Sequence, residues 1–441
     1  MESSKKQLFL LIFAGLLLFS ISISGQGLKD SLVLKLDKWN GQFSKGDTIK
    51  VYSQSLSEKT VEMNIYTNGI LSSIDTIIIA EGASIIYSSV YDKPTSIIIR
   101  LSALNDKNDR TEIGYIVDAG GFKPGFETPK DLRKFWKRQF RTLHRSTMRV
   151  NFNKVDAPVK YGEKYLCYDL EISMPEGMPV RGYMAYPKDA KIKSLPIVIF
   201  AHGAGDLTQK WAQSQIYRAI DYAMRGNGAL VVDINAHGML NGQPSEYYEN
   251  LQKGELKGYS RRTVTDHESF YFRTMFLRMK RLLDYLCKSK LWDRERVLLI
   301  GSSQGAAQAG FLASTDKRVK AAVLTVPAMM DLGAKLDGRK GSWPQLLESQ
   351  GINSPAAKIV PYYDTALLLK GCKAKLYFEA GLIDMSCPPA CVFAGYNAAS
   401  GDKQIHTYPY RSHSQLTGAH LKEWEAKVNN NMNLFIDNYL K

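Results

Sequence analysis

The sequence predicts an α/β fold, with a mainly parallel sheet covered by helices, that follows a small all-β sandwich. Residues 28–117 contain only short β-branched or alternating runs, whereas the chain after residue 126 alternates strand-like and helix-like runs. A glycine-rich linker, residues 118–126, separates the two patterns. Because a change of pattern at such a linker marks a domain boundary, we place the sandwich at 26–119 and the α/β domain at 120–441.

The N-terminal segment has the pattern of a secretory signal peptide. Lys5 and Lys6 precede the apolar run 8–19, and small residues at 22–25 suit a cleavage site. The alternative is a membrane anchor, but such a helix needs about 20 apolar residues, and serines interrupt this run earlier. We therefore expect residues 1–25 to be removed and the mature chain to be periplasmic or secreted, without stable membrane insertion.

The composition is that of a soluble globular protein with a basic charge. Hydrophobic residues make up 44% of the 441 and charged residues 23%, which excludes a disordered chain. The net charge of +15 suits nucleic acid, an anionic surface or a solvated exterior. The densest basic run, 130–145, has apolar residues at helical spacing and so predicts an amphipathic helix with a cationic outer face. We expect that face to be solvated, with no nucleic-acid partner.

The cysteines do not predict a disulfide framework or a metal site. Their number is odd, so at least one stays free or pairs with another chain, and their density is far below that of a disulfide-rich domain. None has the spacing of a metal-binding motif. We expect mainly buried thiols, and no metal, at Cys167, Cys287, Cys372, Cys387 and Cys391.

The all-β part is typical of an immunoglobulin-like sandwich. Its predicted strands cover residues 32–36, 49–53, 61–66, 84–89, 96–101 and 110–117. Asn68-Gly69, between two β runs, is the strongest short hairpin signal. About seven strands in ninety residues suit such a sandwich. No residues in it have a catalytic pattern, so we expect a non-catalytic, separable domain.

The α/β part alternates strands and helices. The predicted strands cover residues 149–152, 165–173, 180–186, 195–200, 229–235, 297–300, 319–326, 374–379 and 404–408. The predicted helices cover 130–145, 208–225, 266–288 and 421–440, with one more after residue 303 and a long loop at 236–265. This alternation implies a mainly parallel sheet with its site at the carboxyl ends of the strands.

The sequence around Ser303 predicts a sharp turn between a strand and a helix. The apolar run 297–300 ends in Gly301-Ser-Ser-Gln-Gly305, and small residues follow. In the G-x-S-x-G turn of α/β-hydrolases the central serine is strained and exposes its hydroxyl above the sheet, while a Cβ at either glycine would clash. The alternative is a glycine-bounded turn with no chemistry.

A second loop precedes this turn in the chain. The strand 195–200 leads into Ala201-His-Gly-Ala-Gly205, and α/β-hydrolases place one oxyanion-hole amide after such a strand. Gly203 and Gly205 lack the third glycine of a dinucleotide-binding loop. We therefore expect no cofactor.

A serine nucleophile needs a base and an acid, and in this fold the order along the chain is serine, acid, histidine. The carboxylate best placed beyond a strand is Asp384, and the histidine best placed beyond the last strand is His413. The other candidates have structural interpretations: Glu379 and His406 lie in strand runs, Asp402 lies in a turn signal, and His420 starts a helix.

Together these residues resemble the acetyl xylan esterase and cephalosporin C deacetylase family of α/β-hydrolases, over roughly residues 122–441. The similarity lies in Gly301-Ser-Ser-Gln-Gly305, in Gly381-Leu-Ile-Asp-Met-Ser-Cys-Pro-Pro389, and in Tyr408-Pro409 shortly before His413. The resemblance implies Ser303 as nucleophile, Asp384 as acid and His413 as base. It also implies that the backbone amides of Ala204 and Gln304 form the oxyanion hole.

The chain departs from the family pattern at three places. The family's Arg-Gly-Gln segment after the second central strand is replaced by Asn235-Ala-His-Gly-Met-Leu-Asn-Gly-Gln243. Ser414 stands where an acid usually follows the histidine, and Ala204 stands where a tyrosine is common. These departures concern the substrate pocket and the ring-like homo-oligomer that the family forms.

Together with the signal-peptide pattern, the resemblance implies an exported serine esterase that removes acetyl groups from acetylated sugars of the xylan or xylo-oligosaccharide type through an acyl-enzyme. Its partner is an acetylated oligo- or polysaccharide, and no cofactor takes part. One alternative is a serine peptidase of the same fold, although such enzymes usually carry a large propeller domain. The other is a non-catalytic carbohydrate-binding protein with an inactive hydrolase domain.

Overall fold

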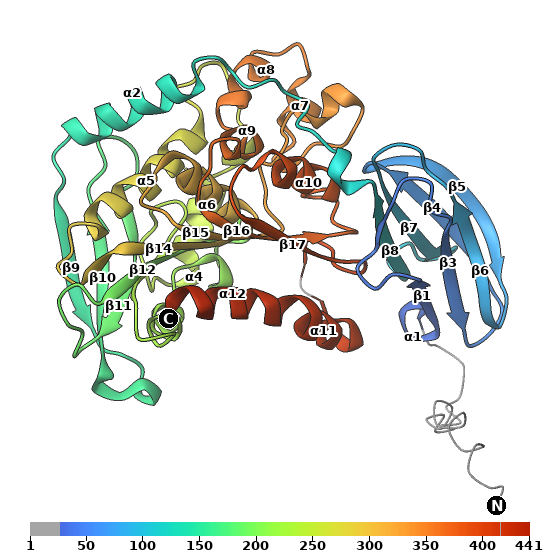
Figure 1. Ribbon diagram of the computed structural model, residues 1–441, viewed down its shortest axis with the longest axis horizontal. Helices are drawn as coiled ribbons and strands as arrows, with labels where there is room; N and C mark the ends of the chain where they lie inside the picture. Colours follow the sequence, from blue (N-terminus) through green and yellow to red (C-terminus); the bar gives the residue numbers. More distant parts are fainter. Residues whose placement is uncertain (1–26, 415) are drawn as a thin grey trace, which may run out of the picture.

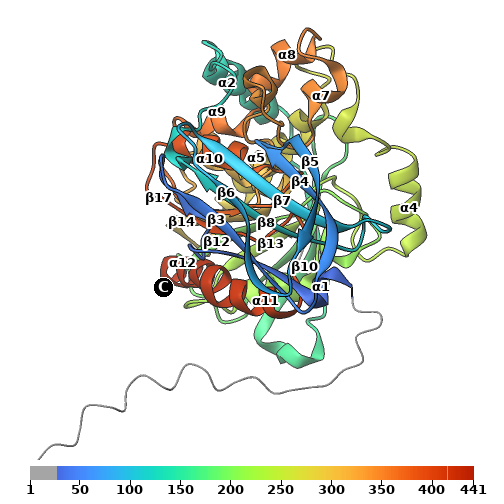
Figure 2. The same ribbon diagram turned by 90° about the vertical axis from the view of Figure 1, so that its right-hand side faces the viewer.

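The computed structural model describes residues 27–414 and 416–441 (Figure 1). The predicted signal peptide, residues 1–25, lies outside the described residues. In the described part, a β-sandwich lies beside a larger body built on one long sheet with helices on both faces, as Figures 1 and 2 show. No helix among the described residues is long and apolar enough to cross a bilayer.

The sandwich follows a short helix, α1 (Leu28–Ser31), and has a three-stranded sheet, β1-β3-β6, and a five-stranded sheet, β2-β8-β7-β4-β5. The two residues of the predicted hairpin turn, Asn68 and Gly69, both have positive φ, as a type I′ turn requires. The sequence did not predict β5, because most of its side chains are exposed and show no alternation. The strands are β1 (Leu32–Leu36), β2 (Gln42–Phe43), β3 (Ile49–Ser55), β4 (Lys59–Thr67), β5 (Ile70–Ile79), β6 (Gly82–Ser89), β7 (Thr95–Ala103) and β8 (Arg110–Val117).

The large sheet has nine strands in the order β17-β16-β15-β14-β12-β13-β11-β10-β9. The strands β12 to β17 are parallel to one another, whereas β9, β10 and β11 pair antiparallel with their neighbours, so the predicted mainly parallel α/β-hydrolase sheet is confirmed. The strands are β9 (Val150–Val155), β10 (Tyr165–Ile172), β11 (Val180–Pro187), β12 (Leu195–Ala201), β13 (Leu230–Ile234), β14 (Trp292–Ser302), β15 (Ala321–Thr325), β16 (Lys375–Gly381) and β17 (Lys403–Tyr408).

Helices cover both faces of this sheet and enclose two apolar cores. One core lies against α2, α5, α6, α9 and α10, and the other against α3 and α12 (Figure 1). The helices are α2 (Leu132–Arg145), α3 (Ile216–Ala223), α4 (Ser245–Lys253), α5 (Tyr271–Leu286), α6 (Gln304–Thr315), α7 (Leu346–Gln350), α8 (Ala356–Ile359), α9 (Thr365–Leu369), α10 (Pro389–Ala398), α11 (Gly418–Trp424) and α12 (Asn430–Leu440).

Two predicted helices begin later than expected, and both corrections have the same cause. Asp206 accepts hydrogen bonds from the backbone and hydroxyl of Thr208, and Asp266 accepts from the backbone of Glu268 and Ser269. These local bonds hold turns where the apolar pattern predicted helix. The predicted loop 236–265 was also wrong in part, since it contains α4.

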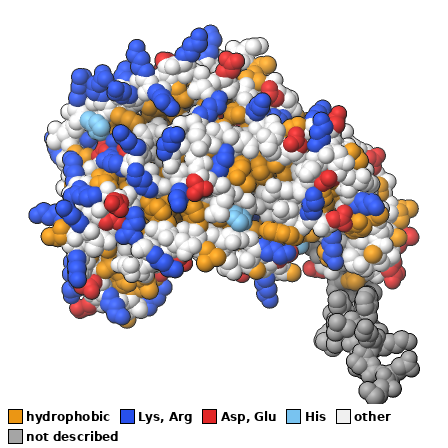
Figure 3. Space-filling model, in the orientation of Figure 1, with side chains coloured by type: hydrophobic (Ala, Val, Ile, Leu, Met, Phe, Trp, Pro, Cys, Tyr) orange, Lys and Arg blue, Asp and Glu red, His pale blue; other side chains and the backbone are white. Residues whose placement is uncertain are grey.

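The cationic face of α2 is solvated, as predicted. Its apolar residues, among them Phe135 and Trp136, are buried, while Arg133, Lys137 and Arg141 on the other side are exposed. Figure 3 shows Lys and Arg side chains spread over much of the drawn face and interspersed with other residues. The thiols of all five cysteines are free and buried, as expected.

The sandwich contacts the segments that follow β16 and β17. The Gly114 amide donates to the Pro409 carbonyl at 2.9 Å, and the Tyr410 hydroxyl donates to the Leu34 carbonyl at 2.6 Å. Gly114 also faces the carbonyl of Leu382, which would lie only 2.1 Å from a Cβ at this position. The sandwich therefore supports the two loops that carry Asp384 and His413.

We expect Gly114→Ala to destabilise the protein and to lower its esterase activity. The added Cβ meets a backbone carbonyl that has no rotamer to adopt, so the sandwich and the Leu382 segment must move apart, at a cost of about 1–3 kcal/mol. Thermal unfolding and the turnover of a small acetate ester measure both effects. Gly120→Ala is the matched control, because its Cβ would meet nothing within 4 Å. Wild-type stability and activity in Gly114→Ala would contradict the account of this contact.

Candidate active site

Ser303 lies in the turn between β14 and α6, and its backbone is strained. Its φ of 54° and ψ of −121° lie in a region that residues other than glycine rarely occupy. A Cβ on Gly301 would lie 2.2 Å from the backbone of Gly305, and a Cβ on Gly305 would lie 2.1 Å from the Ala201 carbonyl oxygen. A Cβ at either position would therefore clash, as predicted, and this explains why the turn needs both glycines.

The structure brings the predicted serine, histidine and aspartate together. His413 Nε2 lies 2.9 Å from Ser303 Oγ, and His413 Nδ1 lies 2.7 Å from Asp384 Oδ2. Asp384 follows β16 and His413 follows β17, so parallel strands deliver all three residues to one edge of the sheet. The Asp384 side chain is 0% exposed, while that of His413 is 30% exposed and so can meet a substrate.

Asp384 is held so that one oxygen faces the histidine. Its Oδ1 accepts hydrogen bonds from the backbone amides of Ser386 and Cys387, each at 2.8 Å. Oδ2 is left to accept the Nδ1 proton of His413, and Nε2 then carries a lone pair toward Ser303. This arrangement can remove a proton from the serine hydroxyl.

The other acids and histidines considered from the sequence make contacts elsewhere. Glu379 Oε1 accepts from Arg411 Nε at 3.0 Å and from Trp424 Nε1 at 2.8 Å. Asp402 is exposed. The His406 ring stacks on Tyr377, and the His420 ring stacks on Tyr410. None of these four side chains contacts Ser303 among the described residues.

The two predicted oxyanion-hole amides lie in segments next to the nucleophile. Gln304 is the first residue of α6, where backbone N–H groups have no helical partner. The loop with Ala204 passes close to Ser303, since a Cβ on Gly203 would lie 3.5 Å from the Ser303 Cβ. In the described structure neither N–H donates a hydrogen bond within the protein. Both donors are therefore free to bind a ligand oxygen.

Cys387 lies within the same group, a position that no sequence motif indicates. Donor atoms of Asp384, Cys387 and His413 all lie within 4.8 Å of one another, a set that could hold a metal ion. Burial raises the pKa of the Cys387 thiol well above its usual value, which disfavours the thiolate that metals bind. His413 and Asp384 already bond to each other, so a metal held by this set would compete with that bond.

Trp211 is a second residue near the site that was not predicted from the sequence. Its indole covers Gly205, where a Cβ would lie 2.1 Å from the ring, and 51% of the residue is exposed. Its backbone carbonyl accepts a hydrogen bond from His202 Nδ1 at 2.8 Å, which ties Trp211 to the loop before Ala204. An exposed aromatic face therefore stands beside the predicted oxyanion loop. The signal in the sequence is a lone tryptophan in a polar segment.

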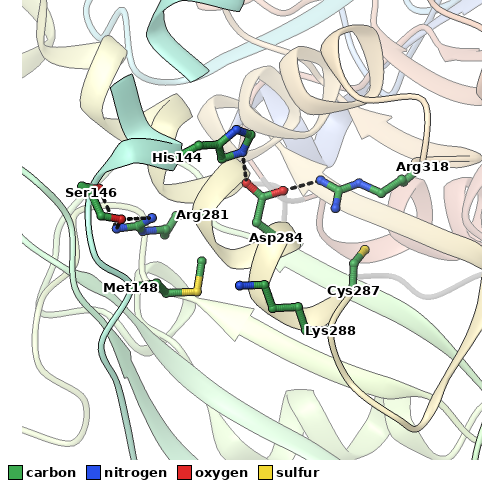
Figure 4. Close-up of a pocket in the computed structure, with 8 residues that line it drawn as sticks. All are labelled: His144, Ser146, Met148, Arg281, Asp284, Cys287, Lys288 and Arg318. Atoms are coloured by element: carbon green, nitrogen blue, oxygen red, sulfur yellow. Dashed lines mark hydrogen bonds and ion pairs between the residues drawn. The ribbon is translucent and has the colours of Figure 1, made fainter. Parts of the chain in front are cut away.

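A surface pocket of about 390 Å³ between α2 and α5 has no comparable chemistry (Figure 4). Its carboxylate, Asp284, lies between His144 and Arg318 and accepts hydrogen bonds from both sides. Its serine, Ser146, bonds to Arg281 at 2.8 Å. Because these bonds occupy the carboxylate and the serine, the pocket offers neither a free carboxylate base nor an activated serine.

Comparison with known proteins gives one consistent result. Residues 120–430 match the family model described as acetyl xylan esterase (AXE1). The acetyl esterase Axe7A of Xylanibacter ruminicola is 27% identical over 336 residues, which cover 75% of this chain and 74% of that protein. Two solved structures share the fold, each over 73% of this chain and 98% of their own. They are an acetyl xylan esterase from Paenibacillus sp. R4 (21% identity, TM-score 0.59) and acetyl xylan esterase 1 from Thermoanaerobacterium sp. JW/SL YS485 (22%, 0.57).

Proposed function

Because this chain belongs to the acetyl xylan esterase family and is a carboxylic ester hydrolase, we propose that it removes acetyl groups from acetylated xylan or xylo-oligosaccharides. In this proposal Ser303 is the nucleophile, His413 the base and Asp384 the acid. The observation that carries it is the continuous hydrogen-bond chain from Ser303 Oγ through the His413 ring to Asp384.

The mechanism follows from that chain. His413 Nε2 takes the proton of Ser303 as its Oγ attacks the acetyl carbonyl carbon, and Asp384 stabilises the imidazolium. The tetrahedral intermediate collapses when His413 returns the proton to the departing sugar oxygen, which leaves an acetyl ester on Ser303. Water, activated by the same histidine, then releases acetate and restores the serine.

The oxyanion of the tetrahedral intermediate needs donors placed in advance. We assign this role to the backbone N–H groups of Ala204 and Gln304, which make no hydrogen bond within the described protein. In a site shielded from water each such donor contributes on the order of 3 kcal/mol to transition-state binding. The dipole of α6, whose N-terminus is Gln304, acts in the same direction.

The exposed indole of Trp211 supports a sugar substrate. Its apolar face lies beside the loop of Ala204 and offers a flat surface on which a pyranose ring can pack. We expect Trp211→Ala to raise KM for an acetylated xylo-oligosaccharide about tenfold and to leave that for 4-nitrophenyl acetate within about twofold. Trp39→Ala, which removes an exposed indole from the sandwich, is the matched control. Equal KM changes on both substrates would count against a sugar platform.

The substrate class is tested by measuring product release. The purified chain is incubated with acetylated xylo-oligosaccharides, other acetylated glycans and N-acylated peptides, and acetate and free amines are quantified. We expect acetate from the acetylated xylo-oligosaccharides at the highest kcat/KM. Release of amines from peptides in preference to acetate from glycans would favour a peptidase instead.

Three further features of the proposal concern the chain as a whole. We propose that the chain is exported after removal of residues 1–25, that 26–119 and 120–441 are its two domains, and that copies associate into a homo-oligomer. The basic N-terminal segment followed by an apolar run supports export. The N-terminal sequence of protein recovered from the periplasm or medium tests the cleavage.

A further inference from the structure

The helix α5 carries three buried arginines, and one of them lacks a counter-charge. Arg273 forms ion pairs with Glu176 and Glu268, and Arg281 donates hydrogen bonds to several backbone carbonyls. Arg278 is only 3% exposed, yet within the described chain it forms no ion pair, and its Nε is buried without a hydrogen-bond partner. Its neighbours are the Tyr271 hydroxyl and, farther away, the Glu255 charge. A buried guanidinium without an ion-pair partner is costly, so this charge indicates a missing ligand.

Two more buried donors without partners lie in the same group of side chains. His237 Nε2 and Gln304 Nε2 are both buried and unpaired within the described residues. The Gln304 Oε1 accepts from the Tyr259 hydroxyl at 2.5 Å, and the Tyr259 ring packs on the His237 ring with their centroids 4.5 Å apart. Gln304 and His237 therefore flank the same tyrosine.

The third member, Arg278, adjoins His237 through Tyr271. His237 Nδ1 lies 2.8 Å from the Tyr271 hydroxyl, and the Arg278 charge opposes the rise that burial causes in the pKa of Tyr271. Burial, and then the Arg278 charge, lower the pKa of His237 to about 3, so the imidazole is neutral. Arg278 can only donate hydrogen bonds, so the Tyr271 hydroxyl accepts on that side and donates a hydrogen bond to His237 Nδ1. Nε2 of His237 is then protonated, and all three unpaired groups are donors.

The strand order places this group on one side of the nucleophile. His237 follows β13, whereas Asp384 and His413 follow β16 and β17, and β14 with Ser303 lies between them in the sheet. The leaving alcohol must lie beside His413, which protonates it. If the proposed function holds, the group of donors therefore lies on the acyl side of Ser303.

We propose that Arg278, His237 and Gln304 form a binding site for a carboxylate on the acyl side of Ser303. A carboxylate accepts only, and its two oxygens fit the fork of a guanidinium while further lone pairs reach the other two donors. This inference rests on the proposed function for its place in the reaction. The carboxylate has two sources: acetate released by the enzyme, or a carboxylate carried by the acyl group of a substrate.

Binding of free acetate is measured by the thermal stability of the full chain at constant, high sodium chloride. Sodium acetate is titrated against wild type, Arg278→Met and the charge control Arg141→Met, with acetamide as the neutral analogue of acetate. Arg141 is exposed on α2, so its loss changes the net charge without altering the buried site. We expect acetate to raise the Tm of wild type and of Arg141→Met but not that of Arg278→Met. Acetamide should not change the Tm of any of the three proteins.

The second arm tests a carboxylate on the acyl group. The values of kcat/KM are compared for 4-nitrophenyl acetate and for the 4-nitrophenyl hemiester of succinate. If the substrate supplies the carboxylate, Arg278→Met lowers the ratio of succinate to acetate turnover at least about tenfold, because an ionic hydrogen bond is lost. If acetate is the ligand, the acetate-induced rise in Tm is seen and this ratio does not change.

The outcomes separate the site from the proposed function. Arg278→Met exchanges a buried cation for an apolar side chain of similar length, which folds well in comparable cases, and His237→Phe provides a second variant that weakens the response. The site is overturned if wild type shows neither the Tm rise nor the hemiester preference, or if Arg278→Met retains them. Acetate binding without any ester hydrolysis would overturn the proposed function and leave the site intact.

Discussion

Ser303→Ala is expected to lower kcat for 4-nitrophenyl acetate about 10⁶-fold, to the level that the oxyanion donors alone sustain. The hydroxyl is the atom within 2.9 Å of His413 Nε2, and no other described side chain offers an oxygen or sulfur nucleophile to that nitrogen. Cys387 is close, but the raised pKa of its buried thiol keeps it protonated. Steady-state hydrolysis over a wide range of enzyme concentration measures the loss.

The same substitution should leave the fold intact. Ser303 is 7% exposed, but its hydroxyl bonds to His413 and its backbone holds the turn. Its amide donates to the Thr325 carbonyl, and its carbonyl accepts from Ala307 and Ala328. Alanine keeps these bonds and the same strained φ. An unchanged circular dichroism spectrum and a Tm close to that of wild type are the control. Activity within about threefold of wild type would show that another residue attacks the ester.

Asp384→Asn is expected to lower kcat about 10⁴-fold by holding the histidine in the wrong tautomer. The amides of Ser386 and Cys387 donate to Oδ1, so the asparagine must place its oxygen there and present its NH₂ to His413. Nδ1 then has to accept a hydrogen bond, and Nε2 carries the proton. A protonated Nε2 cannot take the proton of Ser303. The measurement is kcat for the small acetate ester with an unchanged fold as control.

Two other carboxylates serve as matched comparisons. Asp402→Asn changes an exposed residue whose nearest basic partner, Lys375, is 4.0 Å away, and it should have no effect. Glu379→Gln keeps an oxygen for Arg411 and Trp424 and should reduce kcat less than tenfold, because those contacts only support the loop before His413. Should Asp384→Asn keep most of its activity while either of these loses it, the acid has been assigned to the wrong residue.

The strand-based part of the site could be predicted from the sequence for a physical reason. The carboxyl ends of adjacent parallel strands meet at one edge, so a serine, an acid and a histidine that each follow a strand must lie close together. That is why Ser303, Asp384 and His413 could be chosen before their contacts were known. Glycines at 301 and 305 could be explained in the same way, because close packing at that turn leaves no space for a Cβ. The catalytic roles of the three residues stay predictions.

Other parts of the site depend on facts that the sequence pattern does not contain. Trp211 lies in a stretch predicted as helix, and its exposure depends on the turn that Asp206 holds before α3 begins. Arg278 lies on α5 among other basic residues, and only the folded structure shows that its neighbours Arg273 and Arg281 are paired while it is not. A missing partner is a property of three-dimensional packing.

The central claim, that Ser303 carries the acetyl group during hydrolysis, is tested most directly by mass spectrometry of the trapped acyl-enzyme. The full chain is mixed with an activated acetate ester, quenched in acid within the first turnover and digested. We predict a gain of one acetyl group on the peptide that contains Ser303, and no such gain in Ser303→Ala or after the ester is consumed. An acetyl group that appears on another residue with the kinetics of turnover, or full activity with no acylated protein, would contradict the account.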